Sequence, residues 1–314
     1  MSDRAAPVTV RLKGGLGNQL FQYAAARAVS IEQDRPLRLD TGWYERRGRG
    51  RHYRLREFRI AGRDIPVSKA RHRALAAWLA LPRPFGGAGT FVSEPSDHGY
   101  RPIQARSGAV ILMEGYWQSE RYFREHRATL LEELSPVAGR STGAEPSADS
   151  SATTSSATST APPVESCVEP GSTGGGGSLT TPIDGSVVAV HVRRGDYLAG
   201  GEEHVVSEAY VRRAMASFGA NADFLFFSDD MAWCRERFAA DNVAFAENGS
   251  DVQDLLRMSA AAHNIIANSS FSWWAAWLNP NPGRRVVAPR PWTPHGSHAD
   301  IVAEGWETMP IDGA

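Results

Sequence analysis

The sequence predicts an α/β protein made of two facing Rossmann-like domains, each built around a parallel β-sheet. Strand-like and helix-like segments alternate in both halves of the chain, which is typical of parallel sheets flanked by helices. Each half opens on a short apolar strand, at 8–12 and at 187–192, and a tract of small residues separates the halves. Ligands of such folds bind at the carboxyl ends of strands, so we expect a site in the cleft between the domains.

The tract between the halves, residues 139–182, consists almost entirely of Ser, Thr, Ala, Gly and Pro. Such a segment buries too little apolar surface to offset the entropy lost on ordering, which indicates a flexible linker. We therefore expect an N-terminal domain at 1–138 and a C-terminal domain at 183–314. The length of 314 residues agrees with two domains, since one domain usually takes roughly 100–200 residues.

The N-terminal half begins with a β-α-β pattern. A Gly-rich turn at 14–17 joins the first strand to the first helix. Apolar residues alternate before this turn and recur at helical spacing after it. The expected elements are a strand at 8–12, a helix at 18–33, strands at 36–40 and 109–113, and a helix at 121–134.

The C-terminal half restarts the same pattern. Its first strand is a continuous apolar run, as expected for a strand buried on both faces of a parallel sheet. Ser207 has the position of a helix N-cap. The further expected elements are helices at 207–218, 251–262 and 272–278, and strands at 224–227 and 264–267.

The charge balance argues against a nucleic acid as partner. The chain has 34 Lys and Arg against 35 Asp and Glu, whereas nucleic-acid-binding domains usually carry a basic surplus. The two cysteines, Cys167 and Cys234, have no zinc-type spacing, and Cys167 falls in the linker tract. We therefore expect neither a structural disulfide nor a zinc site.

No segment of the sequence is typical of secretion or of a membrane span. Residues 1–9 lack an apolar core, and the longest apolar stretch, 74–81, is too short to cross a bilayer. We expect a cytoplasmic protein. Arg71 and Arg73 precede that stretch, so an interfacial helix at the inner membrane surface is one interpretation. We favour an ordinary buried helix, because the amphipathic pattern is weak.

The segment from His191 to Tyr197 places charged side chains at the end of a strand predicted to be buried. Such side chains are costly there unless they face a ligand cleft. Arginine matches phosphate oxygens with paired hydrogen bonds, and neighbouring strand side chains point to opposite faces. We therefore expect one of Arg193 and Arg194 to hold the ligand and the other to anchor the loop. The alternative is a solvated turn closed by an ion pair with Asp196.

The segment from Asn268 to Trp274 follows a second predicted strand and precedes a helix. Hydroxyl groups and backbone N–H groups at a helix N-terminus bind anions without a metal ion. The alternative is simple N-capping by Ser270 or Ser272. We expect the tryptophans to pack in the core.

The Gly-rich turn is a weaker signal. Glycines let a backbone approach a ligand closely. The turn is no P-loop, because no Gly-Lys-Ser/Thr follows it, and Leu20 occupies the third glycine position of a dinucleotide fingerprint.

Three acidic residues in the C-terminal half are further candidates. Asp229 and Asp230 follow the strand at 224–227 and can bind a ribose or a metal ion, or cap the next helix. Asp254 lies on the helix at 251–262, where a carboxylate can accept the N1 and N2 protons of guanine. The alternative for Asp254 is an exposed helical acid.

Together these segments resemble the inverting α1,2-fucosyltransferases, glycosyltransferase family 11. The resemblance covers both halves in order and leaves out only the linker tract and connecting loops. The linker is a departure from the family's pattern. The matching stretches are 14–23, 114–119 (Glu-Gly-Tyr-Trp-Gln-Ser), 191–197, 227–230 and 254–278.

The resemblance implies a GT-B fold, GDP-fucose as donor, no metal cofactor, and a galactose-terminated glycan as acceptor. The N-terminal domain would lie on the acceptor side. Arg193 would hold the β-phosphate, His191 would line the nucleotide site, and Asp254 would read guanine. The full set of expected donor contacts is Gly15, Gly17, Asn18, Arg193, Arg194, Asp229, Asp254, Ser269, Ser270 and Phe271.

An α-linked product from a β-linked donor requires one inverting displacement, with charge building on the departing phosphate. Arg193 and neutral donors would stabilise that charge. A carboxylate or histidine must take the acceptor proton. We expect Asp196, by its place in the motif, with His191, Glu202 and Glu203 as further candidates.

Three other functions stay open at this point. One is a transferase that uses a different GDP-sugar, and another is a non-catalytic module that binds nucleotides or carbohydrates. The third is a nicotinamide-dependent oxidoreductase with Asp40 on the ribose, which the missing third glycine disfavours.

Overall fold

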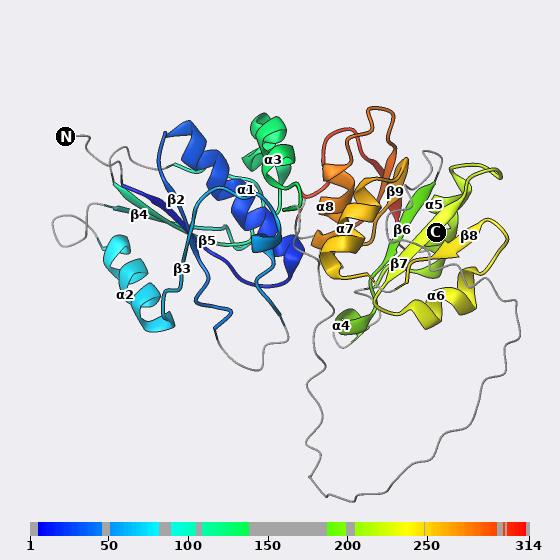
Figure 1. The fold of residues 1–314 in the computed structure, drawn as a ribbon, viewed down its shortest axis with the longest axis horizontal. Helices are drawn as coiled ribbons and strands as arrows, with labels where there is room; N and C mark the ends of the chain where they lie inside the picture. Colours follow the sequence, from blue (N-terminus) through cyan, green and yellow to red (C-terminus); the bar gives the residue numbers. More distant parts are fainter. Residues whose placement is uncertain are drawn as a thin grey trace, which may run out of the picture.

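The computed structural model describes residues 6–45, 51–81, 89–104, 109–137, 187–198, 205–247, 249–293, 298 and 300–311. These residues form two lobes that lie side by side, one from each half of the chain (Figure 1). Each lobe holds one parallel sheet. The predicted α/β class with two Rossmann-like halves, the GT-B arrangement, is confirmed. The predicted linker and both domain boundaries next to it lie outside the described residues.

The N-terminal lobe carries a five-stranded sheet with strand order β3-β2-β1-β5-β4. All neighbouring strands are parallel. Its strands are β1 (Val8–Arg11), β2 (Leu37–Asp40), β3 (Arg63–Ile65), β4 (Gly89–Ser93) and β5 (Val110–Glu114). Its helices are α1 (Leu16–Glu32), α2 (Lys69–Ala80) and α3 (Arg127–Glu133), with 3₁₀ turns η1 (Leu55–Glu57), η2 (Glu120–Tyr122) and η3 (Arg124–His126).

The C-terminal lobe carries a six-stranded sheet with strand order β11-β10-β9-β6-β7-β8. Again all neighbours are parallel. Its strands are β6 (Val188–Val192), β7 (Phe224–Ser228), β8 (Val243–Phe245), β9 (His263–Ile265), β10 (Val286–Arg290) and β11 (Glu307–Pro310). Its helices are α4 (Gly195–Leu198), α5 (Glu208–Ala216), α6 (Met231–Phe238), α7 (Asp251–Ser259) and α8 (Ser270–Leu278).

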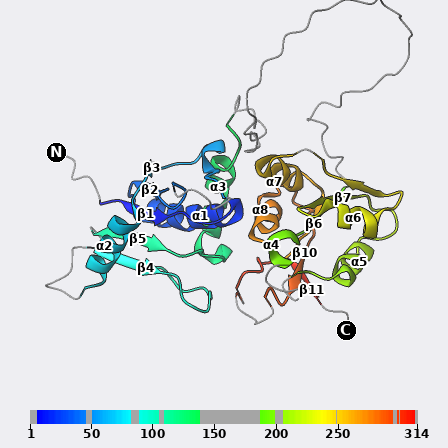
Figure 2. The ribbon, with the colours of Figure 1, turned by 90° about the horizontal axis from the view of Figure 1, so that it is seen from below.

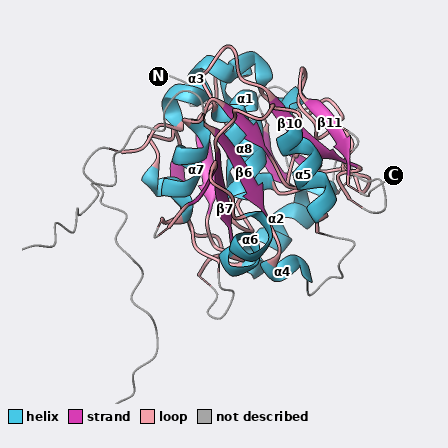
Figure 3. Ribbon diagram, turned by 90° about the vertical axis from the view of Figure 1, so that its right-hand side faces the viewer, coloured by secondary structure: helices cyan, strands magenta, loops and turns pink. Residues whose placement is uncertain are grey.

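Helices cover both faces of the C-terminal sheet. Figure 3 shows α7 and α5 on either side of β6 and β7. Residues of α7 and α8 pack on one face, and residues of α5 and α6 pack on the other. Cys234 of α6 is a buried free thiol, and burial raises the pKa of this thiol to about 11. Cys167 lies outside the described residues.

Two helices begin two residues earlier than the sequence pattern predicts. α1 has Gly15 as its N-cap, so the Gly-rich turn supplies the first helical turn. α8 has Ser269 as its N-cap, whose hydroxyl accepts a hydrogen bond of 3.3 Å from the N–H of Phe271. The alternative considered for this segment, N-capping by Ser270 or Ser272, is therefore wrong. The helix starts earlier because the Ser269 hydroxyl satisfies an N–H group that the first turn leaves open.

An aromatic seam joins the two lobes. Phe21 of α1 lies 4.4 Å from the ring of Trp273 in α8 and 5.2 Å from Trp274. Phe123 stacks on Trp274 at 5.3 Å. Both tryptophans are fully buried, which confirms that they pack in the core. α1 and α8 lie beside each other in Figures 1 and 2, and one hydrophobic core continues through both lobes.

Two expected helices differ from the structure. The helix expected at 121–134 is divided into two 3₁₀ turns and α3, because Phe123 leaves helical geometry with φ −150° while it reaches into the seam. The buried helix expected at 74–81 is instead a surface helix, α2, whose buried residues are His72 and Leu79. Through these residues α2 contacts both β2, where His72 meets Asp40, and β4.

The end of α2 exposes two large apolar side chains. Trp78 is 49% exposed and Leu81 is 50% exposed. The interfacial interpretation of this segment stays a prediction. Within the described residues, every helix falls short of the length and apolar character needed to cross a membrane.

Candidate functional site

A pocket of about 520 Å³ lies between the lobes, at the carboxyl ends of β1, β6 and β7. Sites for small organic ligands usually measure roughly 300–1,000 Å³. Ten residues expected at the site line this pocket: Gly15, Gly17, Asn18, His191, Arg193, Asp229, Asp254, Ser269, Ser270 and Phe271. The other lining residues are Leu16, Arg51, His52, Arg54, Tyr197, Phe227, Ser228 and Asp251.

Two helix N-termini meet at this pocket, one from each lobe. Gly15 caps α1 without a side-chain hydrogen bond, and Ser269 caps α8. A Cβ on Gly17 would lie 2.4 Å from the carbonyl carbon of Ser270. Each helix N-terminus acts as about half a positive charge and offers N–H groups that bind anions. The paired N-termini therefore offer N–H groups from both lobes to one pocket, an arrangement suited to an anion.

Arg193 lines the pocket directly after β6. Its guanidinium lies 3.0 Å from Asp229 and 5.7 Å from the centre of the Tyr197 ring. Asp229 also accepts a hydrogen bond of 2.9 Å from the N–H of Arg194. A Cβ on Gly195 would come within 2.5 Å of the Asp229 carboxylate, so glycine permits this close approach. Asp229 thus orients the loop that carries Arg193.

Arg194 points away from the pocket lining. Its side chain donates to Asp230 at 3.1 Å and lies 4.0 Å from the centre of the Trp233 ring. Asp230 is the N-cap of α6 and accepts a hydrogen bond of 3.2 Å from the N–H of Trp233. Helix capping, the alternative considered for Asp230, is therefore confirmed. The donor contact expected of Arg194 stays a prediction, and the geometry gives this side chain an anchoring position.

His191 lies at the buried base of the pocket. Its ring is 5.5 Å from the ring of Phe271. Burial, with a smaller effect of Arg193, lowers the pKa of His191 to about 3. Within the described residues its Nδ1 atom is buried without a hydrogen-bond partner. His191 therefore presents a neutral imidazole, with one polar atom left for a ligand.

Asp254 lies in the first turn of α7 and lines the pocket. Burial raises the pKa of its carboxyl group to about 6, although Arg257 opposes this shift. The two side chains approach to 3.6 Å. One carboxylate oxygen, Oδ1, is buried without a hydrogen-bond partner in the described part of the chain. Gly249 makes room for it, since a Cβ there would lie 2.1 Å away.

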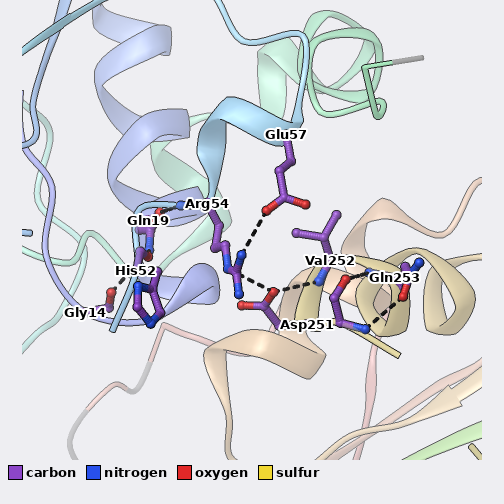
Figure 4. Close-up of polar contacts among 9 residues, drawn as sticks. Gly14, Gln19, His52, Arg54, Glu57, Asp251, Val252 and Gln253 are labelled. Carbon is purple, nitrogen blue, oxygen red and sulfur yellow. Dashed lines mark hydrogen bonds and ion pairs between the residues drawn. The ribbon is translucent and has the colours of Figure 1, made fainter. Parts of the chain in front are cut away.

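The segment 51–54 enters the pocket from the N-terminal lobe, although no motif in the sequence indicates it. Gln19 of α1 holds this segment in place (Figure 4). Its side-chain amide donates to the carbonyl groups of Gly14 at 3.2 Å and His52 at 2.8 Å, and accepts from the N–H of Arg54 at 2.9 Å. Gln19 is fully buried, so the segment is fixed to the Gly-rich turn.

Arg54 then connects the lobes. Its guanidinium lies 3.3 Å from Asp251 of α7 and 3.3 Å from Glu57 of its own lobe, as Figure 4 shows. Asp251 precedes Asp254 by one helical turn. An arginine-rich stretch from 46 to 54 is visible in the sequence. It follows no predicted strand, however, and its spacing gives no reason to place it at a site.

The predicted acceptor base cannot be placed. Asp196 belongs to the short helix α4, but its side chain lies outside the described residues, as do Glu202 and Glu203.

Among the residues that are described, no group of three or more His, Cys, Asp or Glu side chains could hold a metal ion.

Comparison with known proteins identifies the family. The chain is 31% identical over 302 residues to an α-1,2-colitosyltransferase of Escherichia coli, covering 91% of this chain and 92% of that protein. A stretch of 103 residues is 38% identical to galactoside 2-α-L-fucosyltransferase Sec1 of Mus musculus, covering 29% of this chain and 28% of that protein. Among solved structures, the chain is similar to fucosyltransferase NodZ from Bradyrhizobium, with a TM-score of 0.43 and 14% sequence identity. The similarity covers 92% of this chain and 96% of the NodZ chain.

The family model described as Glycosyl transferase family 11 matches residues 179–309. These residues contain the C-terminal sheet except for Pro310, together with most of the pocket residues. The similarity to the colitosyltransferase extends over both lobes. The resemblance noted from the motifs is thereby confirmed. The protein is a glycosyltransferase and belongs to glycosyl transferase family 11, the α1,2-fucosyltransferase family.

Proposed function

We propose that this enzyme transfers L-fucose from GDP-β-L-fucose to the 2-hydroxyl of a terminal galactoside, with inversion and without a metal ion. The observation that carries the proposal is the convergence of two helix N-termini and Arg193 on one pocket. The name of a mammalian relative, galactoside 2-α-L-fucosyltransferase Sec1, supports the transferred sugar and the linkage.

The anion site matches the charge that develops during transfer. As the bond from the sugar to the β-phosphate breaks, its electron pair remains on the phosphate. Arg193, already oriented by Asp229, and the N–H groups of α1 and α8 would stabilise that charge without reorganising. Each such donor is typically worth about 10²–10³ in rate. Permanent positive charge from the protein would thus serve where other transferases use a divalent cation.

Asp254 and His191 suit the nucleoside end of the donor. An ionised Asp254 would accept the N1 and N2 protons of guanine, which gives its unpartnered buried oxygen a hydrogen bond. A neutral His191 would line the base of the pocket without adding charge. These two roles would select a guanine nucleotide.

A second donor has a specific observation in its favour. The relative that is 31% identical over most of the chain is named as a colitosyltransferase. Colitose is L-fucose that lacks the 3-hydroxyl group. A pocket that hydrogen-bonds this hydroxyl would reject the deoxy sugar by about 10⁴–10⁵, whereas an apolar pocket would discriminate by only about 10².

Product analysis with the purified chain separates these possibilities. GDP-fucose, GDP-colitose, GDP-mannose and a UDP-sugar are each incubated with galactose-terminated glycans, with and without EDTA. We expect an α1,2-fucosylated product, identified by NMR, at a rate that EDTA leaves unchanged. If the enzyme used only GDP-colitose, the donor would be GDP-colitose and not GDP-fucose. Loss of transfer in EDTA with recovery in Mg²⁺ or Mn²⁺ would overturn the metal-free chemistry.

A further inference from the structure

A second cluster of charged side chains lies at the carboxyl edge of the N-terminal sheet. Arg11, Asp40 and Glu114 are the last residues of the neighbouring strands β1, β2 and β5. His72 of α2 lies between two of them. Its Nδ1 atom is 3.1 Å from Asp40, and its Nε2 atom is 3.0 Å from Glu114. Carboxyl edges of parallel sheets are where ligands bind.

The inner part of this cluster is rigidly held. Asp40 is fully buried and His72 is 4% exposed. One oxygen of Asp40 accepts hydrogen bonds from the N–H groups of Gly42 at 3.0 Å and Val67 at 3.1 Å. The other oxygen faces His72 and, at 3.4 Å, Arg11. Burying so many charges is costly, so the arrangement holds the ring of His72 in one position at a cost in stability.

Glu114 is the outer member of the cluster. Its side chain is 35% exposed. One carboxylate oxygen, Oε2, contacts His72. The other, Oε1, receives no hydrogen bond from any residue that the structure describes. Asp40 thus orients His72, and His72 orients the Glu114 carboxylate. The Oε1 oxygen of Glu114 stays accessible, as expected for a positioned general base.

The turn that follows Glu114 is equally well determined. The carboxylate of Glu94 accepts hydrogen bonds from the N–H groups of Tyr116 at 2.7 Å and Trp117 at 2.8 Å. Trp117 has φ 58°, a strained conformation for a bulky residue. Such strain persists only where surrounding contacts impose it, and it clusters at functional sites. The turn thus holds the half-buried ring of Tyr116 in one place.

The same turn reaches the donor pocket. The side chain of Gln118 donates to Asn18 at 2.8 Å, and Asn18 lines the pocket. Four residues span at most roughly 14 Å, so Glu114 and Gln118 are separated by no more than a few sugar-ring widths. Lys13 lies 4.7 Å from the Tyr116 ring, and the Tyr44 hydroxyl donates to the carbonyl of Gly14 at 3.0 Å. Aromatic and hydrogen-bonding groups of this kind suit a pyranose ring.

We infer that Glu114 and the turn at 115–118 form the acceptor subsite, where a terminal β-galactoside binds beside Tyr116 with its 2-hydroxyl on Glu114. This inference rests on the proposed function. As the acceptor oxygen bonds to C1 of the donor sugar, its proton passes to Glu114. The electron pair of the broken C1–O bond leaves on the β-phosphate. His72 acts through Glu114 and is a positioning residue.

Glu114→Gln in the full chain tests the base. We expect kcat for transfer to fall about 10²–10³-fold, while GDP affinity stays within twofold. Glu132→Gln, on the exposed face of α3, is the matched control and should behave as wild type. Transfer within threefold of wild type in Glu114→Gln would overturn the inference.

Three further experiments exclude a purely structural role. Azide needs no deprotonation, so Glu114→Ala should form fucosyl azide faster than it hydrolyses the donor. His72→Gln should lower kcat about tenfold with an unchanged acceptor KM. Tyr116→Ala should raise the acceptor KM about tenfold with kcat retained, and Tyr116→Phe should stay near wild type. Absent azide product, or a Glu114→Gln protein that no longer binds GDP, would contradict the assignment.

The outcomes separate this inference from the proposed function. If the wild-type chain neither transfers nor hydrolyses GDP-fucose, the proposed function fails. If the wild type transfers fucose and Glu114→Gln does so equally well, only the acceptor subsite fails.

Discussion

Gly17 of α1 lies directly against the peptide group of Ser270 in α8. A Cβ at position 17 would be 2.4 Å from the Ser270 carbonyl carbon and 2.5 Å from the nitrogen of Phe271. Both neighbours are backbone atoms at the start of a helix, so neither can rotate away. This contact brings the N-termini of the two lobes to one pocket.

Gly17→Ala should therefore separate the two N-termini. We expect the free energy of unfolding to fall by about 1–3 kcal/mol, as for other overpacked sites, and GDP affinity to fall at least tenfold. Thermal unfolding and calorimetric titration measure these effects. Gly283→Ala is the control, because the nearest atom to its Cβ would be Asn281 Oδ1 at 3.5 Å. Equal GDP affinity in both variants would refute the shared anion site.

Arg193 and Arg194 should respond differently to the same substitution. Arg193 lines the pocket, whereas Arg194 contacts Asp230 and Trp233. Arg193→Ala should lower kcat for GDP-fucose by about 10²–10³ with little change in thermal stability. Arg194→Ala should mainly lower stability, by about 1 kcal/mol. Reversed effects in these two assays would exchange the roles of the arginines.

Donor affinity should depend on the ionisation of Asp254. Burial raises the pKa of this carboxyl group to about 6, and only the ionised form can accept hydrogen bonds from both the N1–H and N2–H groups of guanine. Affinity for GDP-fucose, whose phosphates do not titrate in this range, should fall as the pH drops through about 6. Asp254→Asn should bind more weakly and show no such step. A step of equal size in Asp254→Asn would assign it to another group.

His191 should make the fold sensitive to acid. The pKa of His191 is lowered to about 3 in the folded chain, against about 6.5 when unfolded. Between these values only the unfolded state binds the proton, so stability is lost as the pH falls from 6.5 towards 3, by up to about 1.4 kcal/mol per pH unit. Asp254 acts with the opposite sign in part of this range.

The difference between wild type and His191→Gln isolates the histidine. Urea unfolding of both proteins between pH 4 and 7 should show the shallower loss of stability in the variant. Parallel curves would mean that His191 is not buried as a neutral ring.

The ion pair between Arg54 and Asp251 should couple the lobes weakly. The two side chains are 24% and 39% exposed, so we expect a coupling of about 0.5 kcal/mol in GDP binding, which is reduced by salt. A double-mutant cycle of Arg54→Met and Asp251→Asn measures it. The surface pair Arg212–Glu208 on α5 provides the control cycle. Zero coupling at low salt would mean that the contact between Arg54 and Asp251 does not contribute to GDP binding.

The sequence predicts best what depends on short-range pattern. The strands that end at Val192 and Ser228 are continuous apolar runs, and the polar residues after them necessarily share one edge of a parallel sheet. Arg193 and Asp229 were therefore each expected at a strand end, and the parallel pairing of β6 with β7 brings them together. Ser269 and Gly17 came from the motif resemblance, since a glycine or serine alone is a weak signal.

Contacts that depend on long-range packing could not be predicted. The segment 51–54 reaches the pocket only because the buried amide of Gln19 binds its backbone, and no local pattern encodes that approach. The exposure of α2 depends on which strand it covers. His72 and Glu114 are 42 positions apart in the sequence, so no motif spacing indicates that the two side chains are in contact.

The aromatic seam has an optical consequence. Three of the nine tryptophans in the chain, Trp273, Trp274 and Trp277, lie on α8, which packs against α1 of the opposite lobe. Water would reach these indoles if the lobes parted, and their emission would shift to longer wavelength. The natural fluorescence of the unlabelled enzyme therefore reports in real time how a nucleotide sugar enters the pocket. A transient shift to longer wavelength would mean that the lobes separate, and a constant emission would mean that the lobes stay together.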